Sequence, residues 1–212
     1  MNKIVLELQR DALESNSDII SLLRKAYLVA KKLKLKKFER WTNNELNGYK
    51  NNKVPDYRLL IGEVKGWNPF HGWVPVILSE EEEKEINCYR ATDSIANFVD
   101  VYNKKNGNAI FSFNAGLNKI LSNMVGFETK FALFITDNKI YTIIERVRNV
   151  ILDWSITLEE NGILGENLEF SSYERECAQK NPIIYNYTNN FYGNVNNTQI
   201  QQDTKKSIQS KK

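Results

Sequence analysis

Apolar residues recur at intervals of three and four over the first fifty positions, which is the spacing of one face of an α-helix. The pattern predicts helices in residues 2–14, 19–34 and 36–47, with Ser15 or Ser17 as the cap of the second. The buried face of the first helix is expected to comprise Ile4, Val5, Leu8 and Ala12.

The pattern changes between residues 54 and 78, where glycine and proline interrupt short apolar runs. The runs RLLIGEVKGW and WVPVIL predict short strands between turns, and hence a small β element. Ser79 and the three glutamates after it predict a capping box at a helix start. We expect this helix to continue until just before Gly107. Its apolar stripe would comprise Ala91, Ile95, Phe98 and Tyr102.

Helix and strand patterns alternate again in the second half of the chain. Residues 114–126 predict a helix that begins with an asparagine cap and ends at a glycine. Residues 131–136, FALFIT, predict a buried strand. A long periodic stretch predicts a helix over residues 137–161, although β-branched residues leave a strand open as an alternative at 140–144. A last capped helix is expected from Ser171. These elements predict an α+β fold that is predominantly helical.

Residues 181–202 have a composition unlike that of the preceding chain. Ten of these 22 residues are Asn or Gln, none is charged, and apolar residues are interspersed among them. Such mixtures favour strand pairing between chains, whereas a simpler alternative is an asparagine-rich flexible end. We expect an extended segment that self-associates, followed by a disordered end at 203–212. The residues expected to mediate this self-association are Tyr187, Phe191, Tyr192, Val195 and Ile200.

Composition and charge exclude several classes of function. The net charge of +3 gives no overall field that would attract nucleic acid. Two distant cysteines and a start without an apolar signal favour a cytoplasmic protein, and no apolar run is long enough to span a membrane. His71 is the single histidine, so a multi-histidine metal site is excluded, and a turn or packing role is expected for it. The four tryptophans are expected to lie in the core.

One motif suggests an enzyme. Asp56 follows a proline, and Glu63 and Lys65 come later, in the PD…ExK order of metal-dependent nucleases, where two carboxylates hold Mg²⁺ and a lysine assists water. Seven residues of extended chain span about 23 Å, so the carboxylates meet only if the chain turns back within RLLIG. That stretch has no turn residues before its glycine. A structural role for Asp56 and Arg58, in caps and ion pairs, is therefore preferred.

A basic run near the second and third helices offers a binding alternative. It could contact phosphates, but lysines are also common at solvated helix ends. Because the run has no interleaved aromatic stacking platform and the domain is not basic overall, the solvated helix end is preferred over nucleic-acid binding. The run comprises Lys31, Lys32, Lys34, Lys36, Lys37 and Arg40.

Two blocks of the chain resemble a known family. LLRKAYLVAKKLKLKKFERWTNNELNGY with VPDYR, and later RVRNVILDWSITLEENGILGENLEFSSYE, resemble the AbiTii domain of bacterial abortive-infection proteins. The blocks bracket residues 2–180, and the resemblance implies defence against bacteriophage without assigning catalytic residues. FYGNVNNTQIQQDTKKS is similar to C-terminal GxVxxSQIQQGT motifs, with Thr198 and Asp203 replacing the serine and the glycine.

These observations predict an AbiTii-like helical module in residues 1–180, a self-association segment in 181–202 and a disordered end in 203–212. We expect a non-catalytic sensing or regulatory module of abortive infection that forms a homo-oligomer through its C-terminal strands. A phage component or an effector protein is the expected further partner, with no cofactor, metal ion or membrane. The alternative is a metal-dependent nuclease that uses Asp56, Glu63 and Lys65.

Overall fold

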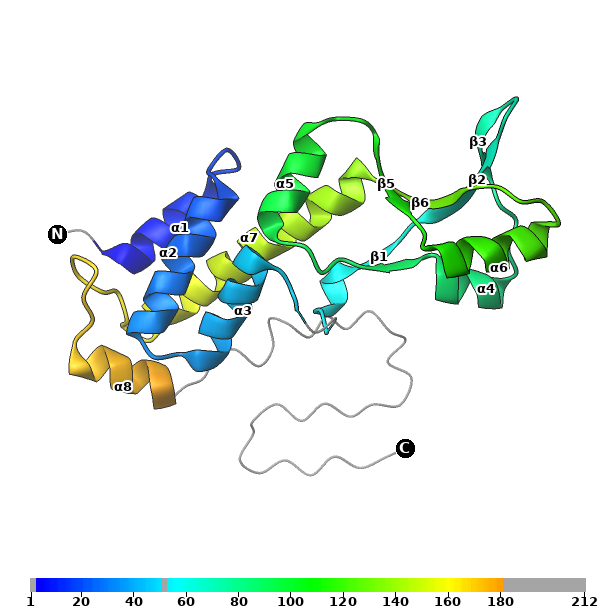
Figure 1. Ribbon diagram of the computed structural model, residues 1–212. Coiled ribbons are helices and arrows are strands. Elements are labelled where there is room, and N and C mark those ends of the chain that lie inside the picture. Colours follow the sequence, from blue (N-terminus) through cyan, green and yellow to red (C-terminus); the bar gives the residue numbers. More distant parts are fainter. Residues whose placement is uncertain (1–2, 51–52, 181–212) are drawn as a thin grey trace, which may run out of the picture.

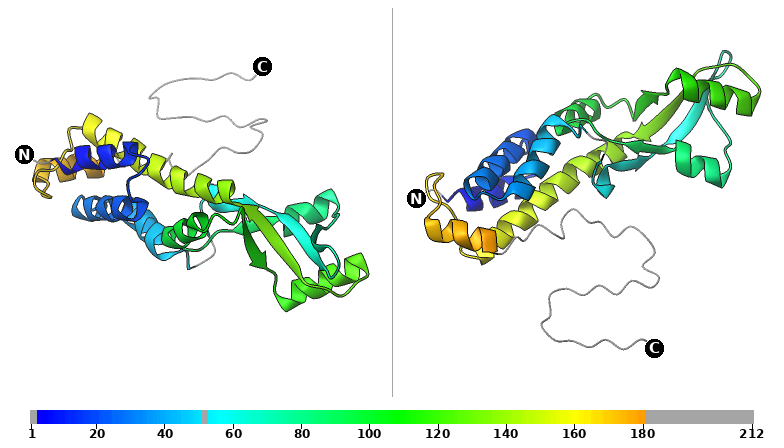
Figure 2. Two further views of the ribbon diagram at one scale, coloured as in Figure 1. Left: turned by 90° about the horizontal axis from the view of Figure 1, so that it is seen from above. Right: turned by 60° about the horizontal axis from the view of Figure 1, so that its bottom comes forward.

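The computed structural model describes residues 3–50 and 53–180. In these ranges helices dominate and small antiparallel sheets accompany them, so the fold is α+β with a helical majority. A helical bundle forms one end of an elongated molecule and the sheets form the other (Figures 1 and 2). The bundle contains α1 (Ile4–Leu13), α2 (Ile19–Lys32), α3 (Lys36–Asn47), α5 (Ile95–Asn103), α7 (Asp137–Glu160) and α8 (Ser172–Lys180).

Two antiparallel sheets make up the other end. The first pairs β1 (Leu59–Ile61) with β4 (Cys88–Arg90) and follows a short 3₁₀ helix, η1 (Asp56–Arg58). The second has the strand order β3-β2-β6-β5. Its strands are β2 (Glu63–Asn68), β3 (Gly72–Pro75), β5 (Asn108–Ser112) and β6 (Phe131–Thr136). Two further helices, α4 (Glu80–Ile86) and α6 (Ala115–Val125), lie beside the strands (Figure 1).

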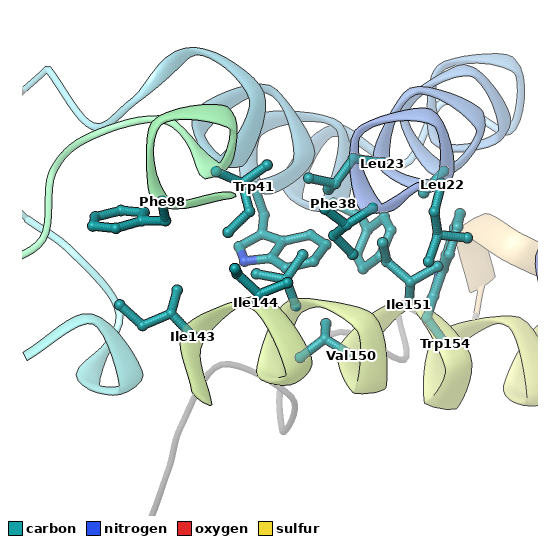
Figure 3. Packing of buried hydrophobic residues seen from close by; sticks show 14 of the residues in the cluster. Leu22, Leu23, Phe38, Trp41, Phe98, Ile143, Ile144, Val150, Ile151 and Trp154 are labelled. Atoms are coloured by element: carbon teal, nitrogen blue, oxygen red, sulfur yellow. The ribbon is translucent and has the colours of Figure 1, made fainter. Parts of the chain in front are cut away.

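Helix α7 connects the two ends of the molecule. It starts directly after β6, and its 24 residues give a length of about 36 Å. Its apolar face packs into the bundle, where Trp154 stacks on Phe38 with ring centroids 3.9 Å apart (Figure 3). Ile151 and Leu22 lie in the same core. Buried residues of α7 run from Ile140 to Leu158, so the core holds the helix along most of its length, and its first turns also lie beside the sheets.

Most of the predicted elements are confirmed. The expected face of the first helix is buried, and residues 131–136 form the buried strand β6. Residues 140–144 belong to α7, because their β-branched side chains pack on the bundle face of a continuous helix. The capping box at Ser79 is present as well. The predicted self-association segment and disordered end lie outside the described residues.

The single helix expected from Ser79 to Gly107 is wrong. Helix α4 ends at Ile86, residues 88–90 form β4, and α5 begins at Ile95 behind a serine cap. Backbone hydrogen bonds extend the pairing of β1 with β4 at both ends. Gly62 N–H donates to the Asn87 carbonyl at 2.8 Å, and Ala91 N–H donates to the Arg58 carbonyl at 2.9 Å. Strand pairing therefore prevails over the helical periodicity.

Two smaller expectations are also wrong. The cap of α2 is Asp18, whose carboxylate accepts from the N–H groups of Ile20 and Ser21. Ser17 instead accepts from Arg148 Nη1 at 2.7 Å. Trp67 is 42% exposed, because β2 places it on a sheet face away from the core.

Candidate functional site

The candidate site is a groove beside β1. A hollow of about 680 Å³ lies between η1, β1 and the first turns of α7. Its apolar floor includes Leu59 and Ile61, which are 38% and 63% exposed. A second hollow of about 460 Å³ adjoins the same two side chains on the α4 side. Ligand sites usually have volumes of this size and a mainly apolar lining.

One polar stripe of α7 forms the opposite wall of the groove. Lys139, Thr142 and Arg146 are spaced three and four residues apart, so their side chains leave the same face of the helix. Lys139 reaches across and donates from Nζ to the carbonyl of Ile61. The groove thus combines an apolar floor with two cationic side chains, and Asp56 lies on its rim.

A buried polar cluster lies behind the groove. Arg58 and Glu45 form an ion pair in which both side chains are 0% exposed. The hydroxyls of Tyr49 and Tyr57 both donate to Glu45 Oε1, at 2.5 and 2.6 Å. Trp41 Nε1 donates to the Tyr57 hydroxyl at 2.9 Å. The carboxylate, the guanidinium and both phenols are therefore paired inside the protein.

The Arg58 guanidinium also fixes the backbone before α5. Its Nη1 donates to the carbonyls of Ala91 and Asp93, at 2.7 Å each. Its Cζ lies 5.3 Å from the centre of the Phe98 ring, in a cation–π contact. The structural role in ion pairs that was predicted for Arg58 is confirmed. Glu45 was not predicted as its partner. Its position four residues after Trp41 places it on the apolar face of α3, and this was the signal in the sequence for a buried acid.

Burial keeps the phenols of this cluster protonated. Desolvation, followed by the nearby Glu45 carboxylate, raises the pKa of Tyr57 well above its usual value. The same two causes raise the pKa of Tyr49. Burial lowers the pKa of the Arg58 guanidinium, but the charge and hydrogen bonds of Glu45, together with Tyr57 and Tyr49, raise it above its usual value. The cluster therefore holds fixed charges and fixed donors, which suits a structural tie better than proton transfer.

Tyr57 belongs to both features. Its side chain lines the groove, while its hydroxyl donates to Glu45 in the buried cluster. Any group that displaced Tyr57 would therefore disturb the contacts of Glu45 and, through it, those of Arg58. This residue gives a direct physical connection between the surface of the groove and the interior of the bundle.

The structure separates the residues of the nuclease alternative into two places. Asp56 lies on η1 at the rim of the groove, whereas Glu63 and Lys65 lie on β2 and are not part of its lining. Lys65 Nζ forms an ion pair with Glu63 at 3.0 Å and lies 5.1 Å from the centre of the Phe134 ring. Within the described ranges, no group of three or more His, Cys, Asp or Glu side chains is arranged to hold a metal ion.

The basic run lies on exposed surface at the α2–α3 junction, away from the groove lining. Lys31 and Lys32 are in the last turn of α2, and Lys36 and Lys37 are in the first turn of α3. Lys31 Nζ lies 3.3 Å from the Tyr27 hydroxyl, and Lys36 forms an ion pair with a glutamate at 3.1 Å. Nucleic-acid binding by these lysines stays a prediction, as does self-association through residues 187–200, which lie outside the described residues.

Comparison with known proteins identifies one family. The model of the family described as AbiTii matches residues 3–183, which includes η1, the groove and the buried cluster. Neither the curated proteins nor the solved structures contain a match to the chain. Among the helices of the described ranges, none is long and apolar enough to cross a membrane.

Proposed function

The chain belongs to the AbiTii family, and we propose that it is a non-catalytic sensing or regulatory module that acts by binding a polypeptide in the β1 groove. The family indicates a role in abortive infection against bacteriophage. Binding of a polypeptide in the groove would be the event that the module senses.

The observation that carries the proposal is the double role of Tyr57. A polypeptide side chain seated on Leu59 and Ile61 would contact the Tyr57 ring, whose hydroxyl is bonded to Glu45. Glu45 in turn holds Arg58, which fixes the backbone at the start of α5. Occupation of the groove would thereby bias the packing of the bundle, as a regulatory module requires.

Chemistry supports binding over catalysis. The charged groups of the cluster are enclosed and paired, so they have no access to a substrate. The groove is lined by apolar side chains of β1 and polar ones of α7, which suit a polypeptide with both apolar and polar residues. We propose that self-assembly through residues 181–202 couples several copies of the module.

A phage-plating assay separates this proposal from the nuclease alternative. Leu59→Asp places a charge on the groove floor, and we expect it to reduce protection at least tenfold. Lys65→Ala and Glu63→Gln lie outside the groove, and we expect protection to stay within about twofold of the wild type. All variants are compared at equal expression and with unchanged thermal unfolding.

The opposite pattern would contradict the proposal. Loss of protection in Lys65→Ala, full protection in Leu59→Asp and Mg²⁺-dependent cleavage of nucleic acid by the purified wild type would together identify a nuclease.

A further inference from the structure

Among the strands of residues 3–50 and 53–180, β1 pairs with β4 alone, along one of its two edges. Arg58 accepts from Ala91 N–H, and Gly62 donates to the Asn87 carbonyl, so these residues face β4. In an antiparallel ladder every second residue bonds to the same neighbour. Leu59 and Ile61 therefore direct their backbone groups to the opposite edge, toward the groove.

Two of the four backbone groups on that edge are already satisfied. The Leu59 N–H donates to the carbonyl of Asp56, and the Ile61 carbonyl accepts from Lys139 Nζ. The Leu59 carbonyl and the Ile61 N–H have no hydrogen-bond partner in the part of the chain that the structure describes. An unpaired donor and acceptor on an accessible strand are a template for another strand.

This pair of groups selects one orientation. In a parallel pair, a single residue donates its N–H to the carbonyl before its counterpart and accepts from the N–H after it. With Leu60 as the counterpart, those two groups are the Leu59 carbonyl and the Ile61 N–H. An antiparallel strand would need both the N–H and the carbonyl of Leu59, or both of Ile61. One group of each residue is already hydrogen-bonded. The open edge therefore fits a strand that runs parallel to β1.

We propose that residues 181–202 of a second copy add to β1 as this parallel strand. The inference rests on the proposed self-assembly and names its docking site. The segment is uncharged. In an extended chain Ile183, Tyr185 and Tyr187 would lie on one face, and Ile184 and Asn186 on the other. Peptide addition of this kind takes its affinity from main-chain bonds and its specificity from alternate side chains.

The position of α8 argues for a second copy over the same chain. Helix α8 ends at Lys180, beside the bundle and far from β1 along α7 (Figure 1). To reach β1 in the same chain, the residues after Lys180 would have to run from the bundle to the sheet end of the molecule (Figure 1). In the same chain the first residues of the segment, among them Ile183 and Tyr185, would then serve as a spacer. A second copy can bring that stretch directly to the groove.

The first test changes one backbone donor. Ile61→Pro removes the N–H at the open edge and leaves the bonds of Leu60 and Gly62 to β4 intact. Ile61→Val retains the donor and a β-branched side chain. We expect the full-length Ile61→Pro protein to associate at least tenfold more weakly than the wild type in sedimentation experiments, and Ile61→Val to match the wild type. Equal unfolding midpoints establish that both variants fold.

The second test identifies the occupant. A photoreactive benzoylphenylalanine replaces Leu59 in full-length protein, and ¹⁴N and ¹⁵N copies are mixed before irradiation. We expect cross-links to peptides from 181–202, half of them joining the two isotopes. Cross-links within one copy, or to other segments, would overturn the inference.

The outcomes separate this inference from the proposed self-assembly. A wild-type protein that stays monomeric at micromolar concentration would overturn both. A wild type that assembles, together with an Ile61→Pro variant that assembles equally well, would overturn only the docking site.

Discussion

Glu45 and Arg58 carry charges that have no contact with water, and each depends on the other. Desolvating a charge costs several kcal/mol, and a buried pair recovers this only with good geometry and further hydrogen bonds. Both conditions hold here, since the two tyrosine hydroxyls and two backbone carbonyls complete the cluster. The pair fixes α3 to η1 and to the start of α5.

Loss of one member of the pair should therefore be costly. We expect Arg58→Met to lower the free energy of unfolding by about 3–5 kcal/mol, because Glu45 is left buried without its counter-charge. Adding Glu45→Gln should restore part of the loss, since the amide oxygen still accepts from the tyrosines. Urea unfolding followed by tryptophan fluorescence measures both variants. A loss below about 1 kcal/mol in Arg58→Met would contradict this view of the cluster.

The sequence indicated only half of this cluster. Arg58 was predicted to serve an ion pair because it follows Asp56 and Tyr57 at the entrance to a strand. Its partner lies 13 positions earlier on α3, and a glutamate on a helix is usually solvated. The pairing depends on how α3 and η1 pack together, which periodicity does not determine.

At the scale of elements, Gly62 separates the two sheets. It joins β1, which pairs with β4, to β2, which pairs with β6. A Cβ at this position would lie 2.8 Å from the Phe134 carbonyl oxygen and 2.7 Å from Leu133 Cγ. The chain can pass from one sheet to the other only because the residue has no side chain.

Two glycine substitutions should have opposite effects. Gly62→Ala should lower the free energy of unfolding by about 1–3 kcal/mol, since backbone must move to admit the methyl group. Gly116→Ala is the matched control in α6, where the nearest atom is the Asn114 side-chain oxygen at 3.4 Å. It should stabilise the protein by up to about 1 kcal/mol. Thermal unfolding resolves the signs, and equal effects would refute the argument.

Elements with strong local signals were predictable, and those set by distant pairing were not. Asn114 and Gly126 mark the ends of α6 in the sequence, and the apolar face of α7 is plain. The break between α4 and α5 has a local mark only at the Ser94 cap of α5, and residues 88–90 become a strand through contact with β1. The same holds for Trp67, whose exposure follows from the side of the sheet that β2 presents.

At the scale of the whole molecule, the groove joins segments about eighty positions apart. Residues 56–61 form its floor and rim, and residues 139–146 form its opposite wall. Lys139 and Arg146 carry no motif, so the sequence alone could not assign them to a site. They meet β1 because α7 begins directly after β6 and extends from the sheets into the bundle (Figure 2).

The elongated shape also places the two proposed assembly elements far apart. The open edge of β1 lies near the start of α7, and the chain leaves the described structure after α8, beside the bundle (Figure 1). Each copy thus presents an acceptor and a donor strand at separate positions. Contacts of this head-to-tail kind form rings if the rotation closes and filaments if it does not.

The most direct test of the account is the molar mass of the full-length protein in solution. Light scattering after size-exclusion chromatography, at micromolar concentration, compares the full chain with a chain that ends at Lys180. We predict an oligomer for the full chain and a monomer for the shortened one. Circular dichroism should show that both chains contain the same number of helical residues. Two monomers of matching mass per chain would contradict it.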